Sequence, residues 1–155
     1  MQFNIICIGK CKDKHINAIY DDYAKRFKPF GAKINLLELN HGKGSVDEVK
    51  SSEKDAILAK VPDSSFIIAL DERGKQYKTS KFANLIAQKT LAGFSNFSLI
   101  IGGAEGLHPE IREKANLVLA LSEMTLPHML VRPILAEQLY RIVTFNNGHP
   151  YHRED

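Results

Sequence analysis

The sequence predicts an α/β fold in which a mainly parallel sheet is flanked by helices. Short apolar runs alternate with longer amphipathic stretches almost from end to end, which is typical of strands and helices that follow one another in such a sheet. The runs show little polar alternation, as expected of strands covered on both faces. With 155 residues, 44% of them hydrophobic, the chain can bury one core, so we expect residues 1–155 to form a single domain.

Apolar runs of strand length occur along the whole chain. They span Gln2–Gly9, Lys33–Leu39, Ser65–Leu70, Asn96–Ile101 and Asn116–Leu121. The fourth run stops at Gly102 and Gly103, and the fifth gives way to the turn-forming residues 122–127. Carboxyl ends of parallel strands meet at one edge of a sheet, and open α/β sheets bind ligands there. We therefore expect a binding crevice at this edge.

Helices are predicted between the strands from the spacing of their apolar residues. They span Ile16–Phe27, Val46–Lys60, Ser80–Ala92 and Pro109–Lys114. Ser45 and Thr79 are residue types that cap helices, and proline is favoured at a first helical position, as at Pro109. A last helix is predicted from Ile134 through Val143. Because proline breaks an interior turn but is tolerated in the first, we expect this helix to begin near Arg132.

A polar segment, 146–155, follows the last helix without a pattern of its own. It gathers two imidazoles, a phenol and a guanidinium, at His149, Tyr151, His152 and Arg153. Histidine can transfer protons near neutral pH, an aromatic ring can stack on a base, and arginine can pair with phosphate. The segment is able to fold over the crevice as a functional tail. A disordered polar terminus has the same composition.

Composition excludes several classes of protein. Cys7 lies in an apolar run and Cys11 follows soon after it, so we interpret Cys7 as a small buried residue and expect neither a disulfide framework nor a metal site. No apolar run is long enough to span a bilayer, and no signal peptide is recognisable, which favours a cytoplasmic protein. A net charge of +3 is compatible with an anionic partner without requiring one.

The loops at the strand ends each allow two interpretations. Gly102 and Gly103 form either a tight turn or an open backbone that a ligand can approach closely, and Gly106 is suited to a positive φ. The segment Leu121–Pro127 either anchors its apolar side chains in the core or packs them against a ligand ring. The charged loop Asp71–Lys75 is typical of a solvated turn. Neither a dinucleotide fingerprint nor a phosphate-binding loop is present.

Several motifs resemble those of the SPOUT-class RNA methyltransferases, and among them a family that modifies large-subunit ribosomal RNA. They are Leu-Asp and Gly-Lys within 70–75, IIGGAEGL at 100–107, LSEMTLPHMLVR at 121–132, AEQLYR at 136–141 and HPYHR at 149–153. The match extends through nearly the whole chain. Ala104 stands where many relatives have proline, and Pro133 where an aliphatic residue is usual.

The resemblance implies a SPOUT fold whose C-terminal part is tied in a trefoil knot, with S-adenosylmethionine as methyl donor and no metal. Residues implied to bind the donor are Leu70, Gly102, Gly103, Leu121, Ser122, Glu123, Met124, Thr125 and Leu126. The implied reaction is methylation of N3 of a pseudouridine in large-subunit ribosomal RNA, on the assembled ribosome. The family acts as a homodimer with the site near the subunit interface.

We assign roles to the tail on this basis. His152, His149 and Tyr151 are the candidate catalytic residues, and Arg153, Arg132 and Lys75 are candidate RNA ligands. No DNA or membrane partner is expected. Two other functions remain: a non-catalytic ribosome-binding factor that has kept the fold, or a methyltransferase of the same fold that acts on another RNA.

Overall fold

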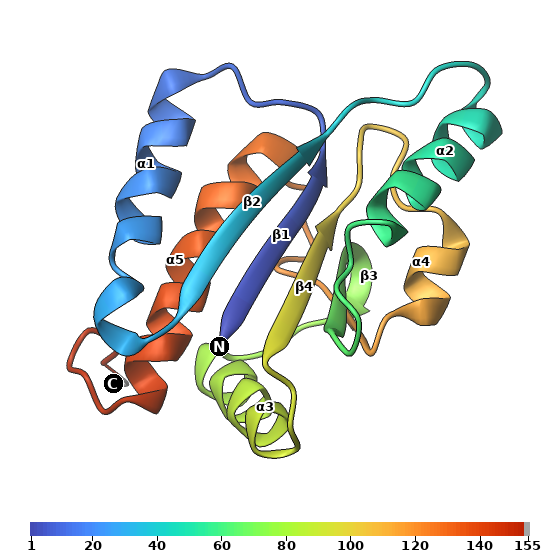
Figure 1. Cartoon of the computed structure of the whole chain (residues 1–155). Helices are drawn as coiled ribbons and strands as arrows, with labels where there is room; N and C mark the ends of the chain where they lie inside the picture. The colour runs from blue at the N-terminus through green and yellow to red at the C-terminus, as the bar shows by residue number, and fades with distance from the viewer. Residues whose placement is uncertain (154–155) are drawn as a thin grey trace.

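The computed structural model describes residues 1–153, which form a five-stranded sheet with helices on both faces (Figure 1). The strands are β1 (Gln2–Ile8), β2 (Lys33–Leu39), β3 (Phe66–Lys75), β4 (Asn96–Ile101) and β5 (Leu117–Leu119). Their order is β2-β1-β4-β3-β5, and every pair is parallel. This confirms the predicted fold class, although β3 is longer and β5 shorter than predicted.

Helices cover both faces of the sheet. One face carries α1 (Lys14–Lys25), α3 (Thr79–Leu91) and α5 (His128–Asn146), and the other carries α2 (Val46–Leu58) and α4 (Pro109–Lys114) (Figure 1). Alternate residues of β1 face the two layers: Phe3 and Ile5 pack on the α5 side, and Ile6 and Ile8 pack on the α2 side. Both faces are buried, as expected of a parallel sheet.

Side-chain caps determine where two of the helices begin. Asp13 accepts hydrogen bonds from the first turn of α1, so this helix begins earlier than predicted. Ser45 forms the predicted cap of α2, completed by the Glu48 side chain, which accepts from the Ser45 amide. Thr79 is not a cap: it is the first residue of α3, and its hydroxyl donates to Gln138 on α5 at 3.0 Å.

The predicted start of α5 near Arg132 is wrong. The helix begins at His128, and Pro133 lies inside it. An interior proline removes one helical hydrogen bond. The buried residues Leu135 and Leu139 pack this helix against its neighbours α1 and α3, so tertiary packing outweighs the local preference.

The end of β3 departs from a regular strand. Leu70 and Lys75 both pair with Leu119, so the residues between them bulge out of the sheet. A Cβ at Gly74 would lie 2.7 Å from the Val118 carbonyl carbon, which is backbone and cannot rotate away. Glycine therefore lets the bulge, 71–74, lie directly against β5 at the carboxyl edge.

Residues 1–153 contain neither a membrane-spanning helix nor a cluster of metal-binding side chains. No helix in this range is long and apolar enough to cross a membrane. No three His, Cys, Asp or Glu side chains in it are grouped so that they could hold a metal ion. Cys7 and Cys11 are free and buried, and burial raises the pKa of the Cys7 thiol to about 11, consistent with its interpretation as a small core residue.

Candidate active site

A pocket opens at the carboxyl edge of the sheet, where β3, β4 and β5 end. Three loops form its walls: the bulge 71–74, the glycine turn 102–107, and the segment 120–127 before α5. The lining residues are Leu70, Asp71, Glu72, Ile101, Gly102, Gly103, Leu119, Leu121, Ser122, Met124, Thr125, Leu126, His128 and Val131. All residues predicted to bind the donor are among them except Glu123, which is exposed on the same segment. Their binding role stays a prediction.

The glycine turn packs so closely on its neighbours that a larger residue would force them to shift. A Cβ at Gly103 would lie 3.1 Å from Ile8 Cγ2 and 3.2 Å from Glu53 Oε2, and Gly102 is equally tight against the Gly106 backbone. Gly106 has the predicted positive φ, at 76°. The turn is tight and also lines the pocket, so both interpretations of the glycine pair describe the same segment.

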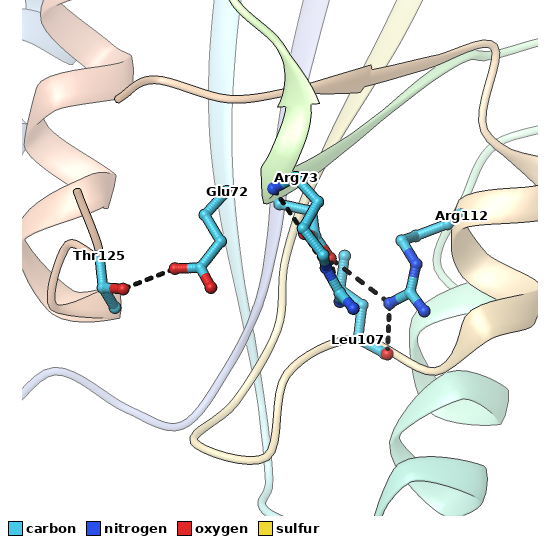
Figure 2. Close-up of polar contacts among 6 residues, drawn as sticks. Glu72, Arg73, Leu107, Arg112 and Thr125 are labelled. Atoms are coloured by element: carbon cyan, nitrogen blue, oxygen red, sulfur yellow. Dashed lines mark hydrogen bonds and ion pairs between the residues drawn. The ribbon is translucent and has the colours of Figure 1, made fainter. Parts of the chain in front are cut away.

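A carboxylate, Asp71, connects the bulge to the glycine turn. Arg73 donates to it from Nε at 2.9 Å and from Nη2 at 3.0 Å, and Arg112 on α4 donates at 3.4 Å (Figure 2). Arg112 also donates to the Leu107 carbonyl at 2.9 Å. The hydrogen bonds from Arg73, followed by the charges of both arginines, hold the pKa of Asp71 below its usual range.

A second carboxylate, Glu72, connects the bulge to the segment before α5. The Thr125 hydroxyl donates to its Oε2 at 2.5 Å (Figure 2). The two side chains come from different loops and meet at the pocket, and both are exposed. Together with Asp71, this contact links all three walls of the pocket.

His128, the first residue of α5, contributes an imidazole to the pocket wall. Its Nε2 is buried and has no hydrogen-bond partner among the described residues. Burial, and then the charges of Arg132 and His41, lower the pKa of His128 below its usual range. The ring is therefore uncharged at neutral pH.

The interpretation of Arg132 as an RNA ligand is not supported by its position. Its side chain is 1% exposed. The guanidinium donates to Glu38 at 2.5 Å and to the carbonyls of Ile8 and Gly9 at 3.0 and 2.7 Å. All these partners lie within the protein, so Arg132 fastens α5 to the ends of β1 and β2.

The tail does not fold over the pocket of its own chain. The Tyr151 ring lies 4.8 Å from that of Tyr140, and its hydroxyl donates to Glu137 at 3.2 Å. The His149 ring packs edge-on against Phe30, with centroids 5.7 Å apart. These neighbours belong to α5 and to the turn before β2, at the opposite edge of the sheet (Figure 1).

The remaining predicted residues lie at both ends of the molecule. The His152 ring is half-buried and lies 5.3 Å from the Phe145 ring, and Arg153 is exposed at the end of the described chain. Lys75 is exposed beside the bulge, with its ammonium over the Tyr77 ring. The tail folds back along the second half of α5: Tyr151 reaches Glu137, which lies nine residues after His128, or about 13 Å along the helix axis at 1.5 Å per residue.

Sequence reasoning missed three polar residues of the pocket: Asp71, Glu72 and His128. The first two follow directly on the partly buried strand residue Leu70, so the expectation that ligands bind at strand ends, which drew attention to Gly102, applied to them too. His128 was obscured because the predicted start of the last helix was placed too late.

Comparisons with known proteins agree on one family. Residues 1–152 match the family described as predicted SPOUT methyltransferase. The chain is 42% identical to ribosomal RNA large subunit methyltransferase H of Clostridium novyi and 38% identical to that of Streptococcus uberis, in each case over 99% of this chain and 100% of the relative. A solved probable methylase family protein from Haemophilus influenzae matches 98% of this chain and 70% of its own, with a TM-score of 0.50 at 17% identity, which is a likeness of fold.

Proposed function

This chain belongs to the SPOUT methyltransferase family, and we propose that it transfers a methyl group from S-adenosylmethionine to large-subunit ribosomal RNA. The observation that carries the proposal is the pocket itself. Three loops whose motifs resemble the donor-binding loops of the family converge on one cavity at the carboxyl edge of the sheet. The names of relatives that align over their full length support ribosomal RNA as the substrate.

The pocket suits the donor chemically. Backbone at Gly102–Gly103 and along 121–126 offers amide and carbonyl groups for a nucleoside, and Leu70, Leu121 and Leu126 offer apolar contacts for its ring. When bound, the donor supplies a methyl group that is already electrophilic because it is attached to a sulfonium. The protein must therefore orient the two reactants, which can contribute roughly 7 kcal/mol or more to lowering the barrier.

The specific acceptor in this proposal is N3 of a pseudouridine in the assembled ribosome, as the family resemblance implies. A bond forms between N3 and the methyl carbon, the bond from that carbon to sulfur breaks, and the N3 proton passes to a base. The donor leaves as a neutral thioether. Because ribosomes are the substrate in this proposal, the protein acts in the cytoplasm. Neither DNA nor a membrane is a partner.

A homodimer explains how the tail can serve a pocket at the other end of the chain. If two α5 helices pack antiparallel, the end of one lies beside the start of the other. Leu130 and Ile134, four residues apart on the first half of α5, are 44% and 39% exposed and supply an apolar face for such packing. In this arrangement the tail of one copy completes the pocket of the other.

The tail then supplies the groups that meet RNA. His152 and His149 are the candidate proton acceptors. Burial and hydrogen bonding to Tyr23 and Glu137 raise the pKa of Tyr151, so its phenol stays protonated and shapes the nucleotide site. Replacing His152 with alanine should lower single-turnover methylation while donor affinity stays unchanged. Arg153 and Lys75 are exposed and remain the candidate phosphate ligands.

Labelled methyl transfer to three substrates tests the function. We expect transfer to assembled ribosomes, and little to free ribosomal RNA or to transfer RNA. No transfer to any of them, with ribosome binding retained, would favour the non-catalytic binding factor. Preferred transfer to transfer RNA would favour the enzyme that acts on another RNA.

Mixing two inactive variants tests the homodimer. Ser122→Trp fills the pocket, and truncation after Gly148 removes the tail. A heterodimer isolated with two affinity tags has one site in which an intact pocket meets an intact tail, so it should recover about half of the wild-type rate. A tail that served its own chain would give an inactive heterodimer.

A further inference from the structure

Two carboxylates line the pocket, and the first of them is already neutralised. The Asp71 side chain is 7% exposed and lies between Arg73 and Arg112, which both donate to it. The imidazole of His128 is uncharged at neutral pH because burial lowers its pKa. Among the lining residues this leaves Glu72 as the side chain whose charge is not compensated within the pocket.

The surroundings of Glu72 leave its charge available to a ligand. Its carboxylate accepts one hydrogen bond, from the neutral Thr125 hydroxyl, and no cation lies within 4 Å of it in the part of the chain that the structure describes. Arg73 is the neighbouring cation, and both of its donating nitrogens are directed at Asp71 (Figure 2). The Thr125 contact holds the Glu72 side chain at the pocket instead of in open solvent.

We propose that Glu72 is a specificity-determining residue that favours the positively charged methyl donor over the neutral product of transfer. S-adenosylmethionine carries a sulfonium, an ammonium and a carboxylate, so its net charge is +1. S-adenosylhomocysteine has lost the sulfonium charge and is neutral overall. A fixed negative charge at the pocket therefore attracts the donor and not the product, which helps the donor compete with the product for the pocket. This inference rests on the proposed function.

The expected size of the effect follows from the exposure of Glu72. Pairs between exposed charges change an equilibrium constant by about two- to fivefold, because water screens them. Added salt weakens such pairs further, since the Debye length falls from roughly 10 Å at 0.1 M to 3 Å at 1 M. The preference for the donor should therefore be modest and should depend on salt.

Calorimetry on three proteins tests the proposal. The wild type, Glu72→Gln and Glu105→Gln are titrated with S-adenosylmethionine and S-adenosylhomocysteine at 0.05 M and 0.5 M salt. Glu72→Gln keeps the size of the side chain and removes its charge. Glu105 is an exposed carboxylate on the glycine turn that does not line the pocket, so Glu105→Gln is the matched control. Melting curves verify that the variants are folded.

The measured quantity is the affinity for the donor divided by the affinity for the product. At low salt we expect this ratio to fall about two- to fivefold in Glu72→Gln and to stay constant in Glu105→Gln. High salt should bring the wild-type ratio toward that of Glu72→Gln. A donor analogue in which an ammonium group replaces the sulfonium should lose affinity in parallel with the donor.

Three results would overturn the inference. Equal loss of affinity for both ligands in Glu72→Gln would mean that Glu72 acts only as a brace through Thr125. An unchanged ratio and unchanged affinities would mean that its charge has no role. A wild-type protein that binds neither ligand, with or without ribosomes, would overturn the proposed function and this inference with it.

Discussion

The buried Arg132 on α5 and the partly exposed Glu38 on β2 form an ion pair, at 2.5 Å. The same guanidinium donates to the carbonyls of Ile8 and Gly9 where β1 ends, and Glu38 also accepts from the Cys11 amide at 2.8 Å. One arginine therefore donates to two buried backbone carbonyls and pairs with a partly exposed carboxylate. This fastens the start of α5, and with it His128, to the edge of the sheet that carries the pocket.

Replacing Arg132 with methionine should be strongly destabilising. The variant leaves the Ile8 and Gly9 carbonyls buried without this donor and removes the cation beside Glu38, a loss of about 3–5 kcal/mol in the free energy of unfolding. Arg132→Lys should not restore stability, because an ammonium cannot reproduce the planar fork. Urea denaturation followed by circular dichroism measures both. Arg153→Met, at an exposed site, is the control, and an equally small effect at Arg132 would contradict the structural role.

Gly74→Ala should disturb the pocket through the backbone. The new methyl group would lie 2.7 Å from the Val118 carbonyl, and both β5 and the bulge 71–74 would have to move apart. We expect a loss of about 1–3 kcal/mol in unfolding free energy and weaker donor binding, since Asp71 and Glu72 lie on the bulge. Denaturation and calorimetry measure the two effects. Gln76→Ala, on the exposed neighbouring turn, should change neither; normal donor affinity in Gly74→Ala would show that the bulge is not needed.

Acid should weaken the protein partly through Asp71. Hydrogen bonds from Arg73 hold the folded-state pKa of this carboxyl below its unfolded value, so the ion pairs stabilise the fold above about pH 4. That stability is lost as the pH falls through the lower, folded-state pKa. Asp71→Asn should therefore be less stable than the wild type at pH 7, with a smaller further loss between pH 5 and pH 2. Unfolding curves across this range measure the difference. Asp63→Asn, an exposed carboxylate before β3, is the control and should keep the wild-type slope; an identical slope in Asp71→Asn would refute the prediction.

The sheet and the pocket were predictable because their signals are local. An apolar run followed by Gly102 and Gly103 marks a buried strand end with open backbone, and parallel pairing then brings such ends together. The place of Arg132 was not predictable in this way. Charged residues on a helix usually face solvent, and its partner, Glu38, is distant in sequence.

The position of the tail, like that of Arg132, could not be predicted from local sequence. Residues 149–153 carry chemistry that suits a crevice, and their composition indicates nothing about which end of the molecule they contact. Their position depends on the length of α5, which starts at His128 and carries the chain to the opposite edge of the sheet. Pro133 obscured that length, because the local cost of an interior proline was taken to exceed the gain from packing α5 on its neighbours.

Truncation after Gly148 should separate folding from function. It removes Tyr151, whose ring packs on Tyr140 and whose hydroxyl donates to Glu137, so a loss of about 1–3 kcal/mol in unfolding free energy is expected from this half-buried contact. Donor affinity should stay at the wild-type level, because none of residues 149–153 lines the pocket of its own chain and the tail is proposed to meet RNA, not the donor. Methylation of ribosomes should be lost, because His149, His152 and Arg153 are removed with the ring.

Tyr151→Phe is the matched variant for this experiment. It keeps the ring on Tyr140 and the rest of the tail, and removes only the hydroxyl, so methylation should fall less than in the truncated chain. Calorimetry, unfolding curves and labelled methyl transfer are measured on both proteins. Retained methylation in the truncated chain would contradict the role of the tail. Loss of donor binding in it would mean that the tail also helps to hold the donor, contrary to the prediction that it meets only the RNA.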